Sequence, residues 1–217
     1  MISNQKGVGL IEVLVALMLL AIAVLGFSAM QLTALKATDE SVQRTRALTV
    51  LRGAAEMMRA NIDGIPAFKT AINTATVTIN TTTGEKNVNP ITNNDTKNLP
   101  ALNEETGTDQ AITKDSCMTG GTPTSCTIKQ LAVKDALTVK QYATDNELNV
   151  SIVTCPGTGT TTTTVASVTT TLSGQERQCF VASWGTTNAT LGTETNDCAD
   201  ANGVYKVGAQ CFIMEAY

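Results

Sequence analysis

The sequence predicts an α+β fold in which one long N-terminal α-helix packs on a small antiparallel β-sheet that disulfide bonds stabilise. Three observations lead to this prediction. An apolar run that begins near Val8 leads into an amphipathic helical pattern that lasts to Asp63. Three segments in the last third of the chain alternate apolar and polar residues, as half-buried strands do. Six cysteines, an even number, all follow residue 116.

The start of the chain predicts a helix that crosses a membrane and stays in the mature protein. Between Val8 and Met30 the only charged residue is Glu12, and these 23 residues span about 34 Å as a helix, which matches a hydrocarbon core of about 30 Å. A secretory signal peptide carries its cleavage site after the apolar run. Here the basic Lys6 and the small Gly7 precede it. We expect the N-terminus in the cytoplasm and the rest of the chain outside.

Glu12 is costly in such a helix. A carboxylate at the centre of a membrane costs on the order of 2 to 3 kcal/mol, and less near the interface. The next basic residue is Lys36, too far along the helix to neutralise Glu12. We therefore expect the partner of Glu12 to come from another molecule.

Residues 6–17, Lys-Gly-Val-Gly-Leu-Ile-Glu-Val-Leu-Val-Ala-Leu, resemble the N-terminus of a type IV prepilin. In that family a membrane peptidase cleaves after the Gly and methylates the new N-terminus, and Glu at the fifth mature position is characteristic. The resemblance implies a leader peptide over residues 1–7 that ends at Gly7, N-methylation of Val8, and an assembly role for Glu12. The Glu12 carboxylate would pair with the Val8 amine of a neighbouring subunit.

Two features depart from the major pilins. The first mature residue would be Val8, where Phe or Met is commoner, which makes the processing site less standard. The kink proline of many major pilins is absent, and this absence, together with the size of the chain, favours a minor pilin or a pseudopilin. The alternative is an ordinary signal anchor in which Glu12 lies at the headgroup boundary. The ordered set of Gly7, Glu12 and the aliphatic run favours the prepilin interpretation.

The composition excludes several functions. With 15 basic and 19 acidic residues, the chain has no electrostatic footprint for nucleic acid, and we expect none to bind directly. Because there is no histidine, Ser-His-Asp and Cys-His catalysis and His-containing metal sites are excluded. We predict a protein that is not an enzyme and has no cofactor, catalytic residue or metal. Two alternatives are a membrane-anchored enzyme, for which no nucleophile motif is found, and a calcium loop over 197–203, which lacks the terminal Glu of a hand loop.

The cysteines predict a disulfide-linked head. None forms a C-x-x-C pair, and the cysteines lie in the part expected outside the cell, which favours disulfides over zinc. Fifteen full pairings are possible, and short loops favour the sequential one. The alternative is that some cysteines are free buried thiols. The disulfide candidates are Cys117, Cys126, Cys155, Cys179, Cys198 and Cys211.

The long helix is expected to run without a break from Val8 to Asp63, 56 residues and about 84 Å. The domains of the chain would be a transmembrane helix over 8–30, an amphipathic continuation of that helix over 31–63, and a globular head over 64–217. Gly64 and Pro66 supply the stop signal. A break into two helices at Gly53 is the alternative.

The head is expected to begin with loop from Pro66 to Asp115, interrupted by a short strand at 76–79. A second helix is predicted over 127–144, followed by strands at 148–154, 178–184 and 210–216. The Thr-rich segment 157–174 is either a long hairpin tip or a fourth strand. One face of the sheet would lie on the helix 31–63, with Trp184 in the core.

The order of long helix, loop, second helix and cysteine-linked sheet, together with Val181-Ala182-Ser183-Trp184, is similar to the PilV group of minor type IV pilins. The resemblance implies a type IV pilin-like fold and processing by prepilin peptidase. It implies an inner-membrane protein with a periplasmic head that later joins other minor pilins and the major pilin, and possible contact with a tip adhesin, at the cell surface. Priming of pilus assembly, and so twitching, adhesion or DNA uptake, would follow. A minor pseudopilin of a type II secretion system shares the same stalk and is the rival expectation.

Overall fold

The computed structural model describes residues 9–91, 111–121, 125–158, 160–165, 168–173 and 177–216, the two Thr-rich stretches 160–165 and 168–173 as backbone alone. The chain divides into two compact units, Met1–Gln43 and Arg44–Tyr217. Helix α1 (Leu10–Ala60) belongs to both units, and each unit is described by itself.

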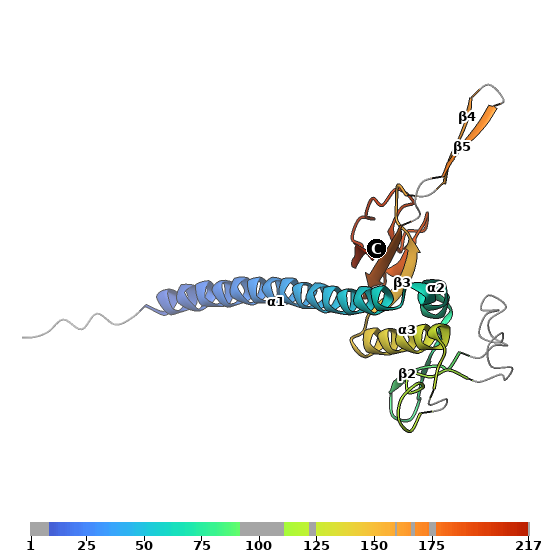
Figure 1. Ribbon diagram of the computed structural model, residues 1–217. Helices are drawn as coiled ribbons and strands as arrows, with labels where there is room; N and C mark the ends of the chain where they lie inside the picture. Colours follow the sequence, from blue (N-terminus) through green and yellow to red (C-terminus); the bar gives the residue numbers. More distant parts are fainter. Residues whose placement is uncertain are drawn as a thin grey trace, which may run out of the picture. The chain divides into compact units, whose positions relative to one another are not determined.

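Helix α1 is one uninterrupted α-helix of 51 residues (Figure 1). It passes through Gly53 without a break, so the alternative of two helices is wrong. It ends at Ala60 and is followed by a 3₁₀ turn, η1 (Ile62–Gly64), close to the stop predicted from Gly64 and Pro66. The expected start at Val8 lies outside the described residues.

In the second unit, α1 contributes an apolar stripe to the core. The buried side chains recur at three- and four-residue steps, as an amphipathic helix requires: Ala47, Val50, Leu51, Ala54, Ala55 and Met58. Leu32, Leu35 and Val42, which continue the stripe toward the N-terminus, are exposed. Within the second unit, the buried stripe of α1 therefore begins at Ala47. That the sheet also covers residues 31–43, which belong to the first unit, stays a prediction.

Two further helices pack in this core. Helix α2 (Ile65–Thr74) replaces the loop that was expected from Pro66 onward, with Phe68 and Ile72 buried. Pro66 lies in the first turn of α2, where the backbone N–H has no partner within the helix, so a proline is tolerated there. The same residue that was expected to stop α1 therefore lies at the start of α2. Helix α3 (Ile128–Asp145) confirms the second predicted helix, and Thr127 and Gln130 form a capping box at its start.

The main sheet confirms the three predicted strands. Strands β3 (Asn149–Thr154), β6 (Gln178–Ser183) and β9 (Cys211–Glu215) pair antiparallel in the order β3-β6-β9. Along β6, Phe180 and Ala182 face the helices, and Trp184 beyond its end is also buried there, as predicted. The ring of Phe180 meets that of Phe68 from α2 edge to face, with centroids 6.3 Å apart.

Three small ladders accompany the sheet. Strand β1 (Val77–Ile79) confirms the short predicted strand and pairs with β2 (Lys86–Val88), which was not predicted. The Thr-rich segment forms a separate antiparallel hairpin of β4 (Thr160–Val165) and β5 (Val168–Ser173), so it is a hairpin tip and not a fourth strand of the main sheet. Strands β7 (Asn188–Leu191) and β8 (Asp197–Ala199), also not predicted, pair in parallel.

Side-chain amides hydrogen-bond to the backbone of two strands. The Asn73 amide of α2 donates to the Ile152 carbonyl at 2.8 Å and accepts from the Ile152 N–H at 2.9 Å. The Gln141 amide of α3 donates to the Lys86 carbonyl at 2.7 Å and accepts from the Val88 N–H at 2.8 Å. These amides tie α2 to β3 and α3 to β2.

Candidate assembly site on the N-terminal helix

The exposed part of α1 is mostly apolar, and its only charged residue before Lys36 is Glu12. Every residue from Leu10 to Val42 is exposed, and 17 of them are large apolar side chains. By length and composition, α1 is the one helix in the described part of the chain that could cross a membrane. So much apolar surface is unfavourable in water, so this segment requires lipid or other protein chains around it.

The hydroxyl groups of this segment are satisfied inside the helix. Ser28 donates to the Val24 carbonyl at 2.9 Å, Thr33 to that of Ala29 at 3.1 Å, and Thr38 to that of Ala34 at 2.9 Å. Because no water is available in an apolar environment, such internal hydrogen bonds remove the cost of unpaired hydroxyls. The segment can therefore be buried without leaving the hydroxyls of Ser28, Thr33 and Thr38 unpaired.

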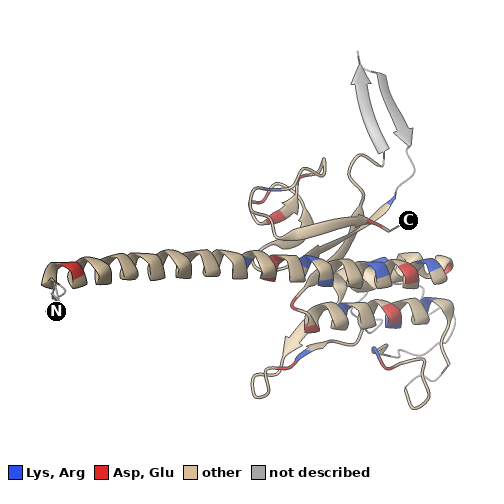
Figure 2. Ribbon diagram, turned by 90° about the vertical axis from the view of Figure 1, so that its left-hand side faces the viewer, with Lys and Arg blue, Asp and Glu red and all other residues tan. Residues whose placement is uncertain are grey.

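Glu12 is the acidic residue in the first turn of α1, and its backbone N–H donates to the Gly9 carbonyl at 2.9 Å. A carboxylate at a helix N-terminus is stabilised by the unpaired N–H groups there, by about 0.3 to 1 kcal/mol. Among the described residues, its side chain has no hydrogen bond or ion pair. Lys36, 24 positions further on, lies about 36 Å along the helix, and Figure 2 shows the long uncharged stretch between the two. The Glu12 carboxylate is thus available to another molecule.

The two residues expected at the processing site, Gly7 and Val8, lie outside the described residues. Cleavage after Gly7 and methylation of Val8 remain predictions from the sequence.

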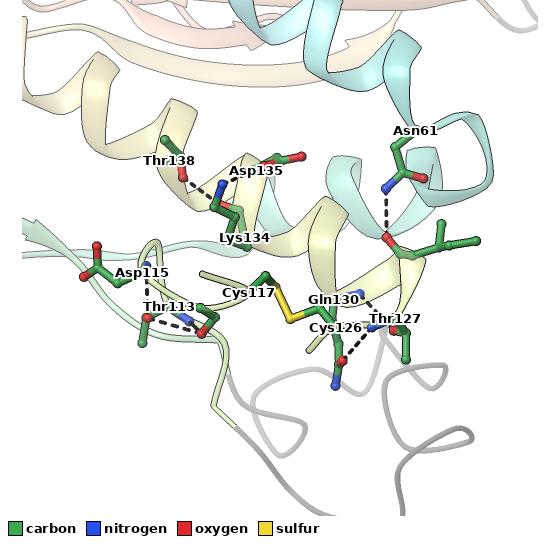
Figure 3. The surroundings of a disulfide bond; sticks show 12 residues. Asn61, Thr113, Asp115, Cys117, Cys126, Thr127, Gln130, Lys134, Asp135 and Thr138 are labelled. Atoms are coloured by element: carbon green, nitrogen blue, oxygen red, sulfur yellow. Dashed lines mark hydrogen bonds and ion pairs between the residues drawn. A yellow bond between two sulfur atoms is a disulfide. The ribbon is translucent and has the colours of Figure 1, made fainter. Parts of the chain in front are cut away.

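In the head, all six cysteines form disulfides. Cys117 is joined to Cys126, Cys155 to Cys179 and Cys198 to Cys211. No cysteine is free, so the alternative of free thiols is wrong, and the three pairs are the sequential ones that short loops favour. Figure 3 shows the first bridge just before α3, near the hydrogen bond from Asn61 to the Ile128 carbonyl.

The loop considered for calcium uses its carboxylates within the fold. The buried Asp197 accepts hydrogen bonds from the Thr190 hydroxyl at 2.5 Å and from the Glu194 N–H at 3.0 Å. Asp200 accepts from the N–H groups of Asn202 and Val204, both at 2.9 Å. No group of three or more side chains that could hold a metal ion occurs among the described residues.

Comparison with known proteins places these features in a family. The family model described as type IV pilin Tt1218 matches residues 29–137, just over half of the chain, and the prokaryotic N-terminal methylation motif matches residues 2–28. No curated protein and no solved structure gives a match.

An apolar helix that begins within an N-terminal methylation motif, followed by a disulfide-linked α+β head, defines a subunit of the type IV pilin class. The chain belongs to the Tt1218-like family of type IV pilins. It is a structural protein and not an enzyme. Its methylation motif implies processing by prepilin peptidase and assembly with other pilins, with a membrane-anchored state before assembly.

Proposed function

We propose that this type IV pilin is a minor pilin, similar to PilV, that helps to prime pilus assembly. The observation that carries the proposal is the exposed apolar helix whose only charge between Gly9 and Met30 is the Glu12 carboxylate, in a segment that matches the methylation motif. A helix of this kind is covered by lipid before assembly and by neighbouring helices afterwards. Other minor pilins and the major pilin are the proposed partners, with twitching, adhesion or DNA uptake as the dependent functions.

The proposed maturation begins with removal of residues 1–7 and methylation of Val8. The segment 8–30 then holds the subunit in the inner membrane with the head in the periplasm, and residues 31–63 continue the stalk. During assembly the Glu12 carboxylate pairs with the Val8 amine of a neighbour. The pair is stronger in the apolar filament interior than in water, because the local dielectric constant is lower.

The first test is the N-terminal mass of the protein isolated from membranes or sheared pili of the source bacterium. We expect a chain that begins at Val8 with one added methyl group. A chain that begins at Met1 would contradict the proposed maturation and favour a signal anchor.

Glu12→Ala tests the assembly step. We expect cleavage after Gly7 to continue and incorporation into sheared pili to fall below detection on an immunoblot, because the neighbour's amine loses its counterion in an apolar environment. Glu40→Ala is the matched control, since Glu40 is an exposed acid on the same helix beyond the apolar run. Normal incorporation of Glu12→Ala would contradict the proposed pair.

Deletion of the gene separates the pilus from the rival, a type II secretion pseudopilin. We expect fewer surface pili and reduced twitching, with secretion of exoproteins unchanged. Loss of secretion with normal piliation would assign the chain to the secretion system.

A further inference from the structure

The head contains a cavity of about 470 Å³, which is within the range of about 300 to 1,000 Å³ that small-molecule sites occupy. It lies where β2, the C-terminal end of α3, the start of β3 and the segment after β6 meet. The residues that line it are Lys86, Thr144, Glu147, Leu148, Asn149, Ser183, Trp184, Gly185, Thr186, Thr187 and Asn188. None of them belongs to the stalk or to the proposed assembly contacts.

The lining is polar and mostly uncharged. Hydroxyl and amide side chains predominate, and the cavity has one charge of each sign, Lys86 and Glu147. Neither charged side chain has a hydrogen bond or ion pair with another residue in the described ranges. Elsewhere in the head, Lys134 pairs with its neighbour Asp135 at 3.1 Å. The two cavity charges are therefore left to solvent or to a ligand.

Two buried donors belong to residues that line the cavity, one on each face of the strand end. The Ser183 hydroxyl and the Trp184 indole N–H have no hydrogen-bond partner within the described part of the head. These side chains are 0 % and 6 % exposed, and both residues line the cavity. A buried donor without an acceptor is unfavourable and is rare in folded proteins. The described part of the head thus supplies neither donor with an acceptor.

Glu147 has a backbone conformation that is unfavourable for its residue type. It follows α3 with φ of 60°, in the left-handed region where glycine is preferred. The Leu148 N–H bonds to the Ala143 carbonyl at 2.9 Å, and the Glu147 N–H bonds to that of Thr144 at 3.0 Å. These are the two hydrogen bonds of a Schellman helix end, whose left-handed position is usually glycine. Residues held in strained conformations concentrate at binding sites, and here the strained residue brings a carboxylate to the cavity.

We propose that this cavity binds a neutral carbohydrate. Sugar hydroxyls both donate and accept, so they can pair with the Glu147 carboxylate, the Lys86 ammonium, and the amides of Asn149 and Asn188. A ligand with one charge would pair with only one of Lys86 and Glu147 and would meet a like charge at the other. A zwitterion such as a dipeptide could pair with both charges, and it is the alternative that the test distinguishes.

The test is saturation-transfer NMR on the full chain in micelles of a zwitterionic detergent, because detergents with sugar headgroups would compete. The probes are galactose, glucose and N-acetylglucosamine, each added singly, and glycylglycine as the zwitterion. We expect transfer to at least one hexose and none to glycylglycine. Transfer to no hexose, or to glycylglycine alone, would overturn the proposal.

Substitutions of cavity residues test whether the hexose binds in this cavity, and the Tm of each variant shows whether the fold is affected. We expect Asn188→Ala and Glu147→Gly to weaken hexose binding at least tenfold, while Glu147→Gly raises the Tm because glycine relieves the strained backbone. Glu85→Gln, an exposed acid in the β1–β2 turn outside the cavity, is the control and should bind as the wild type does. Unchanged binding in the two cavity variants, or a lower Tm for Glu147→Gly, would overturn the assignment.

Discussion

Three carboxylates of this pilin illustrate how differently one chemical group is used. Glu12 has no side-chain partner among the described residues. Asp197 is buried and accepts from Thr190 and Glu194, which lets a polar group lie in the core without an unpaired oxygen. Asp200 is half-buried and holds a turn by accepting from two backbone N–H groups. Only the role of Glu12 could be inferred from the sequence, because Glu12 is the one charged residue in a long apolar run, whereas Asp197 and Asp200 lie in a polar segment.

The Asp200 turn gives a pH-dependent prediction. The hydrogen bond from the Val204 N–H lowers the pKa of the Asp200 carboxyl below its ordinary value of 3.8, with smaller contributions from Asn202 and Lys206. A carboxyl whose pKa is lower in the folded state stabilises the fold above its unfolded pKa, and this contribution is lost as the pH falls through the folded pKa. We expect Asp200→Asn to have a lower Tm than the wild type above pH 4, and the difference to shrink as the pH falls below that value.

Thermal unfolding followed by circular dichroism between pH 2.5 and 6 would measure this difference. Asp63→Asn is a suitable control, because Asp63 is an exposed acid outside this turn. A difference between Asp200→Asn and the wild type that is independent of pH would contradict the proposed role of the carboxylate.

At the scale of the element, the sequence predicts the parts with strong periodicity. Helix α3 and strands β3, β6 and β9 follow from apolar spacing and alternation. Helix α2 was missed because Pro66 was interpreted only as a stop, although proline fits the first turn of a new helix. Strands β7 and β8 have only four and three residues and pair across a loop, so their local pattern carries too little information. The cavity could not be predicted, because it brings together β2, α3 and β6 from distant parts of the chain.

Gly64 occupies the tight junction between α1, α2 and α3. A Cβ atom there would lie 2.6 Å from the Ala132 Cβ and 2.7 Å from the Asn61 amide nitrogen. Asn61 is held in place by its hydrogen bond to the Ile128 carbonyl. We expect Gly64→Ala to lower the free energy of unfolding by about 1 to 3 kcal/mol, as overpacking of a rigid site does.

Gly53→Ala is the matched control for this substitution. Gly53 lies inside α1, with no atom within 4 Å of the position its Cβ would take. Because alanine favours a helix over glycine, we expect this variant to be more stable by about 0.5 to 1 kcal/mol. Urea unfolding of both variants in the same detergent would measure the two effects. Equal stability of the Gly64 and Gly53 variants would show that the junction is not tightly packed.

At the scale of the whole molecule, the disulfides supplement a core that one sheet and parts of three helices form. Each bridge restricts the unfolded chain, and the effect grows slowly with the length of the loop that it closes. The sequence separations are 24 for Cys155–Cys179, 13 for Cys198–Cys211 and 9 for Cys117–Cys126. The Cys155–Cys179 bridge, which closes the loop that contains β4 and β5, should therefore contribute most to stability.

Double serine variants of each pair would test this order. We expect losses of about 3.5, 3.0 and 2.7 kcal/mol for the separations of 24, 13 and 9, as loop entropy alone gives. The measurement is the urea midpoint of each full-length variant, with the slope of the transition fitted separately. A larger loss for the Cys117–Cys126 pair than for Cys155–Cys179 would show that native contacts, and not loop length, decide the contribution.

The amides of Asn73 and Gln141 have a consequence for polymerisation. A filament brings the heads of its subunits to a very high local concentration, and open strand edges could then cross-link them into disordered aggregates. The Asn73 amide hydrogen-bonds to the backbone of Ile152, and the Gln141 amide hydrogen-bonds to the backbone of β2. The Tyr205 hydroxyl accepts from the Ile213 N–H of β9 at 3.2 Å. These side chains leave fewer open backbone groups on the strand edges for pairing with the head of another subunit.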